Sequence, residues 1–92
     1  MFVKGALYEI VDDNSFVAYY TSGEFMCHLG TGIMFVFLSY HRAEDGFFNG
    51  MTVLLPMVGH QAFMGHCDHR NPADWFPFVC LLAQPQKEES GE

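Results

Sequence analysis

Hydrophobic and polar positions alternate along much of this chain, and the alternation predicts short β-strands. Ala6, Tyr8 and Ile10 form one face of the segment 6–11, and we expect that face to point inward. The later runs are rich in aromatic and β-branched residues, which favour strands. In order, the predicted strands and extended segments cover residues 6–11, 16–20, 25–29, 33–40, 51–55, 61–67 and 78–82.

Turn-forming residues separate these segments. Residues 12–15 and 21–24 contain Asp, Asn, Ser and Gly, which favour turns through local hydrogen bonds or conformational freedom. Residues 58–60 supply a further turn around Gly59. Gly30-Thr31-Gly32 stands before a strand, whereas a phosphate-binding loop needs a longer glycine pattern that opens a helix. We therefore interpret this Gly-x-Gly as a turn.

The segment 33–40 differs from the others because it is apolar on both faces. Such a strand is covered on both sides, or one side is left for a partner. Two signals compete for the hairpin that follows, Asp45-Gly46 and Asn49-Gly50. Residues 73–76 are expected to form one helical turn before the last strand.

One spaced pattern resembles a known class of small barrels. It runs Leu29-x-x-Gly32-x-x-Phe35-x-x-Leu38, then Gly46-Phe47-Phe48, Val53, Gly59 and Gly65. This is similar to the core pattern of bacterial SH3-like and KOW-like barrels. In those families a glycine precedes a long bent strand, an aromatic opens the next strand, and a one-turn helix precedes the last. The resemblance implies an all-β, SH3-like small barrel of about five or six antiparallel strands.

Length and charge narrow the function classes. The 92 residues suit one domain, expected over residues 1–83, with a flexible acidic tail at 84–92. The net charge of −7, with only four basic residues, disfavours direct nucleic-acid binding and attachment to anionic membranes. It favours a protein partner with a basic surface. Three cysteines, no signal peptide and no membrane-length apolar run predict a cytoplasmic protein.

Cysteine and histidine residues offer a weak metal site. Cys27, His66, Cys67 and His69 could supply four zinc ligands from two strand ends. The chain lacks a Cys-x-x-Cys half-site, and neighbours on a strand point to opposite faces. The alternative interpretation, which we favour, places Cys27, Cys67 and Cys80 as small core residues, with no cofactor bound.

Exposed aromatics and acids are the candidates for partner binding. Each adjacent aromatic pair in a strand should turn one ring outward, and outward Tyr, Phe and Trp anchor interfaces. Acids in the turns could gather at one end of the barrel, or simply keep a small protein soluble. The candidate partner-binding residues are Tyr19, Tyr20, Phe47, Phe48, Trp75, Asp12, Asp13, Glu44 and Asp45. A homodimer would also account for exposed aromatics.

These observations favour a non-catalytic, acidic protein-binding module that docks on a larger, more basic protein. Its size and acidity resemble those of phage-encoded inhibitors of host enzymes or defence systems. A small zinc-binding domain is the alternative, and a small hydrolase using Cys67 or Cys27 with a histidine ranks last, because no catalytic residue set can be assigned.

Overall fold

The fold is a single curved, antiparallel β-sheet. The computed structural model describes residues 1–12, 15–42 and 49–85. Within these residues the sheet has seven strands, so the all-β prediction is confirmed and the count of five or six was too low. The strands are β1 (Leu7–Ile10), β2 (Phe16–Tyr19), β3 (Phe25–Leu29), β4 (Met34–Arg42), β5 (Asn49–Leu55), β6 (His60–His66) and β7 (Val79–Ala83).

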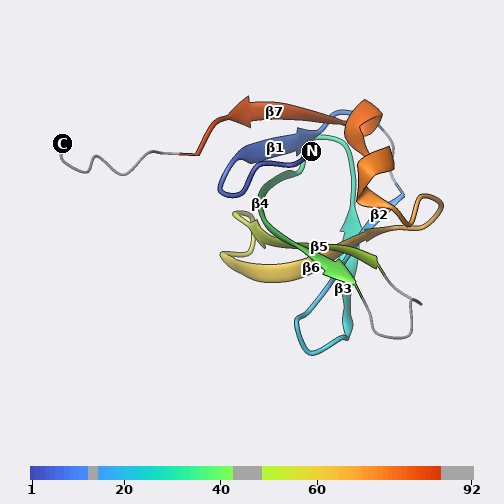
Figure 1. The fold of residues 1–92 in the computed structure, drawn as a ribbon. Helices are drawn as coiled ribbons and strands as arrows, with labels where there is room; N and C mark the ends of the chain where they lie inside the picture. The colour runs from blue at the N-terminus through green and yellow to red at the C-terminus, as the bar shows by residue number, and fades with distance from the viewer. Residues whose placement is uncertain (13–14, 43–48, 86–92) are drawn as a thin grey trace.

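The strand order places two edges far apart in the sheet. Neighbours follow the order β3-β2-β6-β5-β4-β1-β7, and every neighbouring pair is antiparallel. The sheet curls around a core without closing, and β3 and β7 are its edge strands (Figure 1). None of the described helices has the length and apolar character that crossing a membrane would require.

Alternation along the strands builds the core. The predicted inward face of the first strand is confirmed, because Ala6, Tyr8 and Ile10 are all buried. Their neighbours on other strands continue the same inner face, with Phe35 opposite Tyr8 and Val53 opposite Phe37. The core holds Phe2, Ala6, Tyr8, Ile10, Phe16, Ala18, Leu29, Phe35, Phe37, Met51, Val53, Leu55, Ala62, Met64 and Trp75.

The turns follow the glycines with one exception. Gly32 (φ +97°) and Gly59 (φ +79°) adopt the left-handed conformation that favours glycine, so both predicted turns are confirmed. Of the two competing hairpin signals, Asn49-Gly50 does not form the tip: both residues belong to β5, where they pair with Arg42 and His41. The competing Asp45-Gly46 signal lies outside the described residues.

The predicted helical turn before the last strand is confirmed. Two short 3₁₀ helices precede β7, η1 (Pro72–Asp74) and η2 (Phe76–Phe78). The Asn71 side chain accepts a hydrogen bond from the backbone N–H of Ala73 and caps η1. Between the two lies Trp75, whose indole Nε1 donates to the His69 carbonyl at 2.7 Å. Trp75 is fully buried, so its predicted role as an exposed partner-binding residue is wrong.

Candidate functional site

The two members of each described aromatic pair differ in their exposure to solvent. Tyr20 is 43% exposed and its ring stacks on His60 at 6.0 Å, whereas Tyr19 is half-buried. In the pair with buried Trp75, Phe76 is the exposed member and stacks on Phe2 at 4.4 Å. In each of these two described pairs, one ring is more exposed to solvent than the other. The third pair, Phe47 and Phe48, lies outside the described residues.

Of the four acidic residues predicted to bind a partner, the structure describes only Asp12. Asp12 is exposed at the end of β1. Asp13, Glu44 and Asp45 lie outside the described residues, so a shared acidic patch stays a prediction.

Outward-facing aromatic residues do come together on the convex side of the sheet. Tyr19 is flanked in register by Phe25 of β3 on one side and Phe63 of β6 on the other. The Tyr19 and Phe25 rings meet edge to face at 5.9 Å, and His41 of β4 stacks on Phe63 at 4.3 Å with an interplanar angle of 19°. We call Phe25, Tyr19, Phe63 and His41 the outer aromatic row.

Register explains why these four side chains share a face. Phe16 and Ala18 of β2 are buried in the core, so the intervening position and Tyr19 point to the opposite face. Phe63 lies between buried Ala62 and Met64, and alternation turns it outward as well. The row therefore lies on the side of the sheet away from the core.

A glycine allows the row to cross β5. His41 is paired with Gly50, which has no side chain on the outer face, and the imidazole reaches over β5 to Phe63 on β6. Gly50 is also needed for packing, because a Cβ there would collide with the carbonyl oxygen of Met64. The same residue thus permits close contact of β5 with β6 and contact between His41 and Phe63.

The row is partly open to solvent. Phe25 is 51% exposed at the sheet edge, and Tyr19, Phe63 and His41 are half-buried. Phe25 also contacts the His28 ring at 5.3 Å, which extends the aromatic surface along β3. An exposed edge ring followed by half-buried rings is an arrangement suited to receive a side chain from a partner.

Of the cysteine and histidine candidates, His66 and His69 lie together, with ring centroids 4.9 Å apart. His66 is buried at the end of β6, and its Nδ1 accepts the backbone N–H groups of Asp68 and His69, both at 3.0 Å. Cys67 is exposed and Cys27 is half-buried on β3. In the described part of the chain, no group of three or more His, Cys, Asp or Glu residues could hold a metal ion. The four residues named as zinc candidates are therefore not assembled into a site.

The proposed core role of the cysteines is also only partly right. Cys27 packs against the core, whereas Cys67 and Cys80 are exposed and all three are free thiols. Cys67 lies in the loop after β6, and Cys80 lies on edge strand β7.

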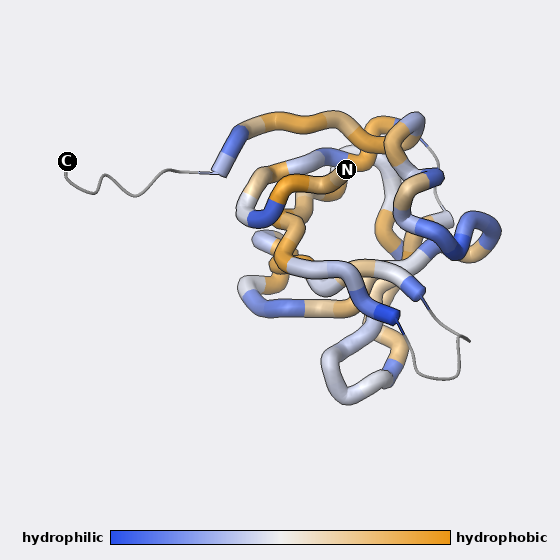
Figure 2. The backbone as a smooth tube through the Cα atoms, viewed as in Figure 1, coloured by the Kyte–Doolittle hydropathy of each residue, from blue (hydrophilic) through white to orange (hydrophobic). Residues whose placement is uncertain are grey.

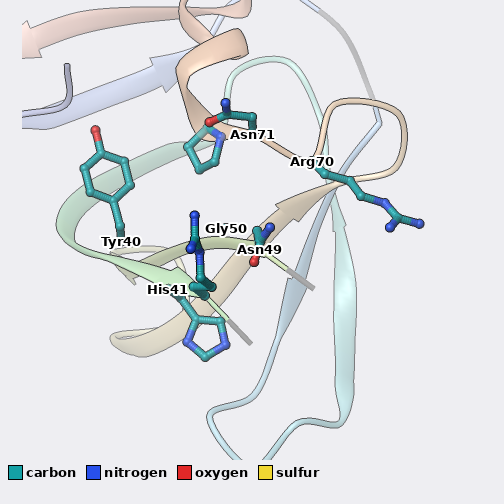
Figure 3. Close-up of a pocket in the computed structure, with 8 residues that line it drawn as sticks. Tyr40, His41, Asn49, Gly50, Arg70 and Asn71 are labelled. Carbon is teal, nitrogen blue, oxygen red and sulfur yellow. The ribbon is translucent and has the colours of Figure 1, made fainter. Parts of the chain in front are cut away.

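A pocket of about 350 Å³ lies beside the start of β5. Its lining residues are Tyr40, His41, Arg42, Asn49, Gly50, Arg70, Asn71 and Pro72. Figure 3 shows the side chains of Arg70 and His41 directed away from Tyr40 and Asn71, so these four side chains do not converge on one point. The Asn49 Oδ1 is buried there without a hydrogen-bond partner among the described residues. This pocket lacks the convergent nucleophile and base that hydrolysis requires.

Three members of the outer aromatic row were missed as sequence candidates. Adjacent pairs of Phe, Tyr or Trp were the sequence candidates. Phe25 and Phe63 each lack an aromatic neighbour in the chain, and His41, which follows Tyr40, is not a member of such a pair. Alternation within residues 61–67 could have placed Phe63 outward, but its proximity to Tyr19 depends on the pairing of β2 with β6, which are distant in sequence.

No protein-family model, curated protein or solved structure matches this chain.

Proposed function

We propose that this chain is a non-catalytic protein-binding module that docks through its outer aromatic row. The observation that carries the proposal is the register of Tyr19 between Phe25 and Phe63, extended by His41. Aromatic residues, Phe and Tyr included, are enriched at protein interfaces, and Tyr is frequent at their energetic centres because it offers a large contact area at low entropic cost.

The charge of the chain supports a basic protein as the partner. The net charge of −7 attracts basic surfaces over several ångströms and accelerates association. Glu24, exposed in the turn that precedes Phe25, adds a negative group at one end of the row. An arginine of the partner could stack on Tyr19 or Phe25 and pair with Glu24, since guanidinium groups favour both contacts.

Aromatic surfaces also bind single-stranded nucleic acid, but such platforms need a positively charged groove along the backbone. Only four basic residues against eleven acids make that class of ligand unfavourable here. A positively charged protein segment can both pack against the aromatic rings and pair with the acidic side chains.

The same proposal includes an SH3-like topology, a cytoplasmic location and a biological role. An SH3-like topology is supported by Gly32 before long strand β4 and by the 3₁₀ turns before the last strand. A reducing cytoplasm is supported by three free thiols. Inhibition of a host protein, as phage-encoded proteins of this size perform, is the biological role that we propose for docking.

Affinity capture with matched variants tests the docking surface. Phe25→Ala removes the most exposed ring of the row, and Met34→Ala removes a comparably exposed apolar side chain, 42% against 51%, near the other end of β4 from His41. We expect Phe25→Ala to lose a basic partner that wild type and Met34→Ala retain at low salt. Equal retention by both variants, or a partner that is acidic, would contradict the proposal.

A further inference from the structure

Strand β7 is an open, uncharged edge. It pairs with β1 on one side, and among the described residues no strand pairs with its other side. Four of its five residues, Cys80 to Ala83, are exposed, with Leu81 at 42% and Leu82 at 45%. Figure 1 shows β7 at the outside of the fold, and Figure 2 shows it as a continuous hydrophobic stretch. Exposed apolar edge strands of this kind are templates for pairing with another strand.

Backbone hydrogen bonds identify which groups of β7 point to that edge. Ile10 directs both its N–H and its C=O toward the start of β4, through bonds with Ile33 and Gly32. It therefore directs neither group at Val79, its partner in β7. Antiparallel pairs alternate, so Leu81, opposite Tyr8, also lies in a pair without bonds to β1. Leu81 accordingly presents its N–H and C=O on the open side.

The two sheet edges differ in the polarity of their side chains. Both edge strands carry a register shift, β3 opposite Ala18 and Tyr19 and β7 opposite Leu7 and Tyr8. β3 carries His28 among its exposed residues, whereas the five residues of β7 include no polar side chain, charge or proline that would discourage strand addition.

We propose that β7 pairs with β7 of a second copy of this chain. A basic partner has no complementary charge on this neutral strand, whereas a second β7 matches it in both charge and hydrophobicity. A two-fold axis makes the two strands antiparallel without further adjustment. With Leu81 on the axis, before the register shift of β7, Leu81 of each copy exchanges both backbone hydrogen bonds with its equivalent.

The size of the contact predicts a weak dimer. A pairing of two five-residue strands falls below the ~1,000 Å² expected of stable interfaces. The dimer should therefore dissociate on dilution. Because β7 and β3 are opposite edges of the sheet, dimerisation leaves Phe25 and the outer aromatic row available to another partner.

Sedimentation velocity from micromolar to millimolar protein tests the proposal. We expect a rise in average mass with concentration in wild type, loss of that rise in Leu81→Lys and Leu82→Lys, and retention in Val58→Lys. Val58 is 40% exposed in the turn between β5 and β6, so it controls for a lysine at an exposed apolar position. Monomers at every concentration, or dimers unaffected by both β7 variants, would overturn the pairing.

Thiol cross-linking gives a second readout that does not depend on lysine variants. In the proposed register the two Cys80 residues are diagonal neighbours, ~7–8 Å apart, within reach of a short bismaleimide. We expect a cross-linked dimer from a variant that keeps only Cys80, and none from one that keeps only exposed Cys67. Equal cross-linking of both variants would show random collision and contradict the proposal.

Discussion

Trp75 offers the clearest test of the division between core and surface. Its indole is fully buried, packs edge to face on Phe16 at 5.2 Å, and donates to the His69 carbonyl at 2.7 Å. Trp75→Phe removes the hydrogen bond, worth ~1 kcal/mol when the carbonyl can be rehydrated. It also removes ring atoms equivalent to roughly two or three methylenes, at ~0.8 kcal/mol each.

These losses sum to about 3 kcal/mol, a large share of the ~5–15 kcal/mol that stabilises a small domain. For a domain of this size each kcal/mol lowers the melting temperature by roughly 4–8 °C, so we expect a fall of at least about 12 °C. Thermal unfolding followed by circular dichroism measures the change. Intrinsic fluorescence gives an independent check, because Trp75 is the single tryptophan and should resist quenching by acrylamide.

Tyr20→Phe is the matched control. It also removes the polar group of an aromatic residue, but Tyr20 is 43% exposed. The free energy of unfolding of the Tyr20→Phe variant should differ from that of wild type by less than ~0.5 kcal/mol, as is usual for surface positions. A melting temperature of Trp75→Phe within a few degrees of wild type, or an indole as quenchable as free tryptophan, would refute the placement of Trp75 in the core.

Three further predictions follow from the packing around the sheet. Gly50→Ala should destabilise the fold by ~1–3 kcal/mol or more in urea unfolding, because the new Cβ meets the backbone oxygen of Met64, which cannot rotate away; a neutral substitution would show that β5 and β6 do not approach so closely. His66→Phe should cost ~1–2 kcal/mol and accelerate amide exchange at Asp68 and His69, whose N–H groups lose their acceptor; unchanged exchange at both amides would disprove this role. A chelator should leave the melting temperature unchanged, whereas a fall that zinc restores would revive the zinc-binding alternative.

The fold was predictable from local pattern to a large extent. Period-two alternation located the strands and the inward face of β1, and Gly32 and Gly59 marked real turns. The Asn49-Gly50 signal misled because the sequence of a type I′ turn is also compatible with a strand that needs a glycine for close approach. A single local signal could not distinguish the two uses of Gly50.

The candidate site was less predictable, because it depends on pairing between distant segments. Tyr19 was identified from an adjacent aromatic pair, yet its neighbours Phe25 and Phe63 follow from the register of β2 with β3 and β6. Trp75 was misplaced because it was chosen as a member of an adjacent aromatic pair, with strand alternation assumed, whereas it lies between two 3₁₀ helices and its indole belongs to the core. Sequence composition specified the kind of residue at the surface, and topology decided which residues meet.

Site-specific photo-crosslinking tests docking through the outer aromatic row most directly. A photoreactive phenylalanine analogue replaces Phe25 in one variant and Met34 in another, and both are irradiated in lysate at low salt. We expect a discrete cross-linked product with a basic protein from position 25, diminished at high salt and absent from position 34. Equal products from both positions, or none from position 25 in a folded variant, would contradict docking through the row.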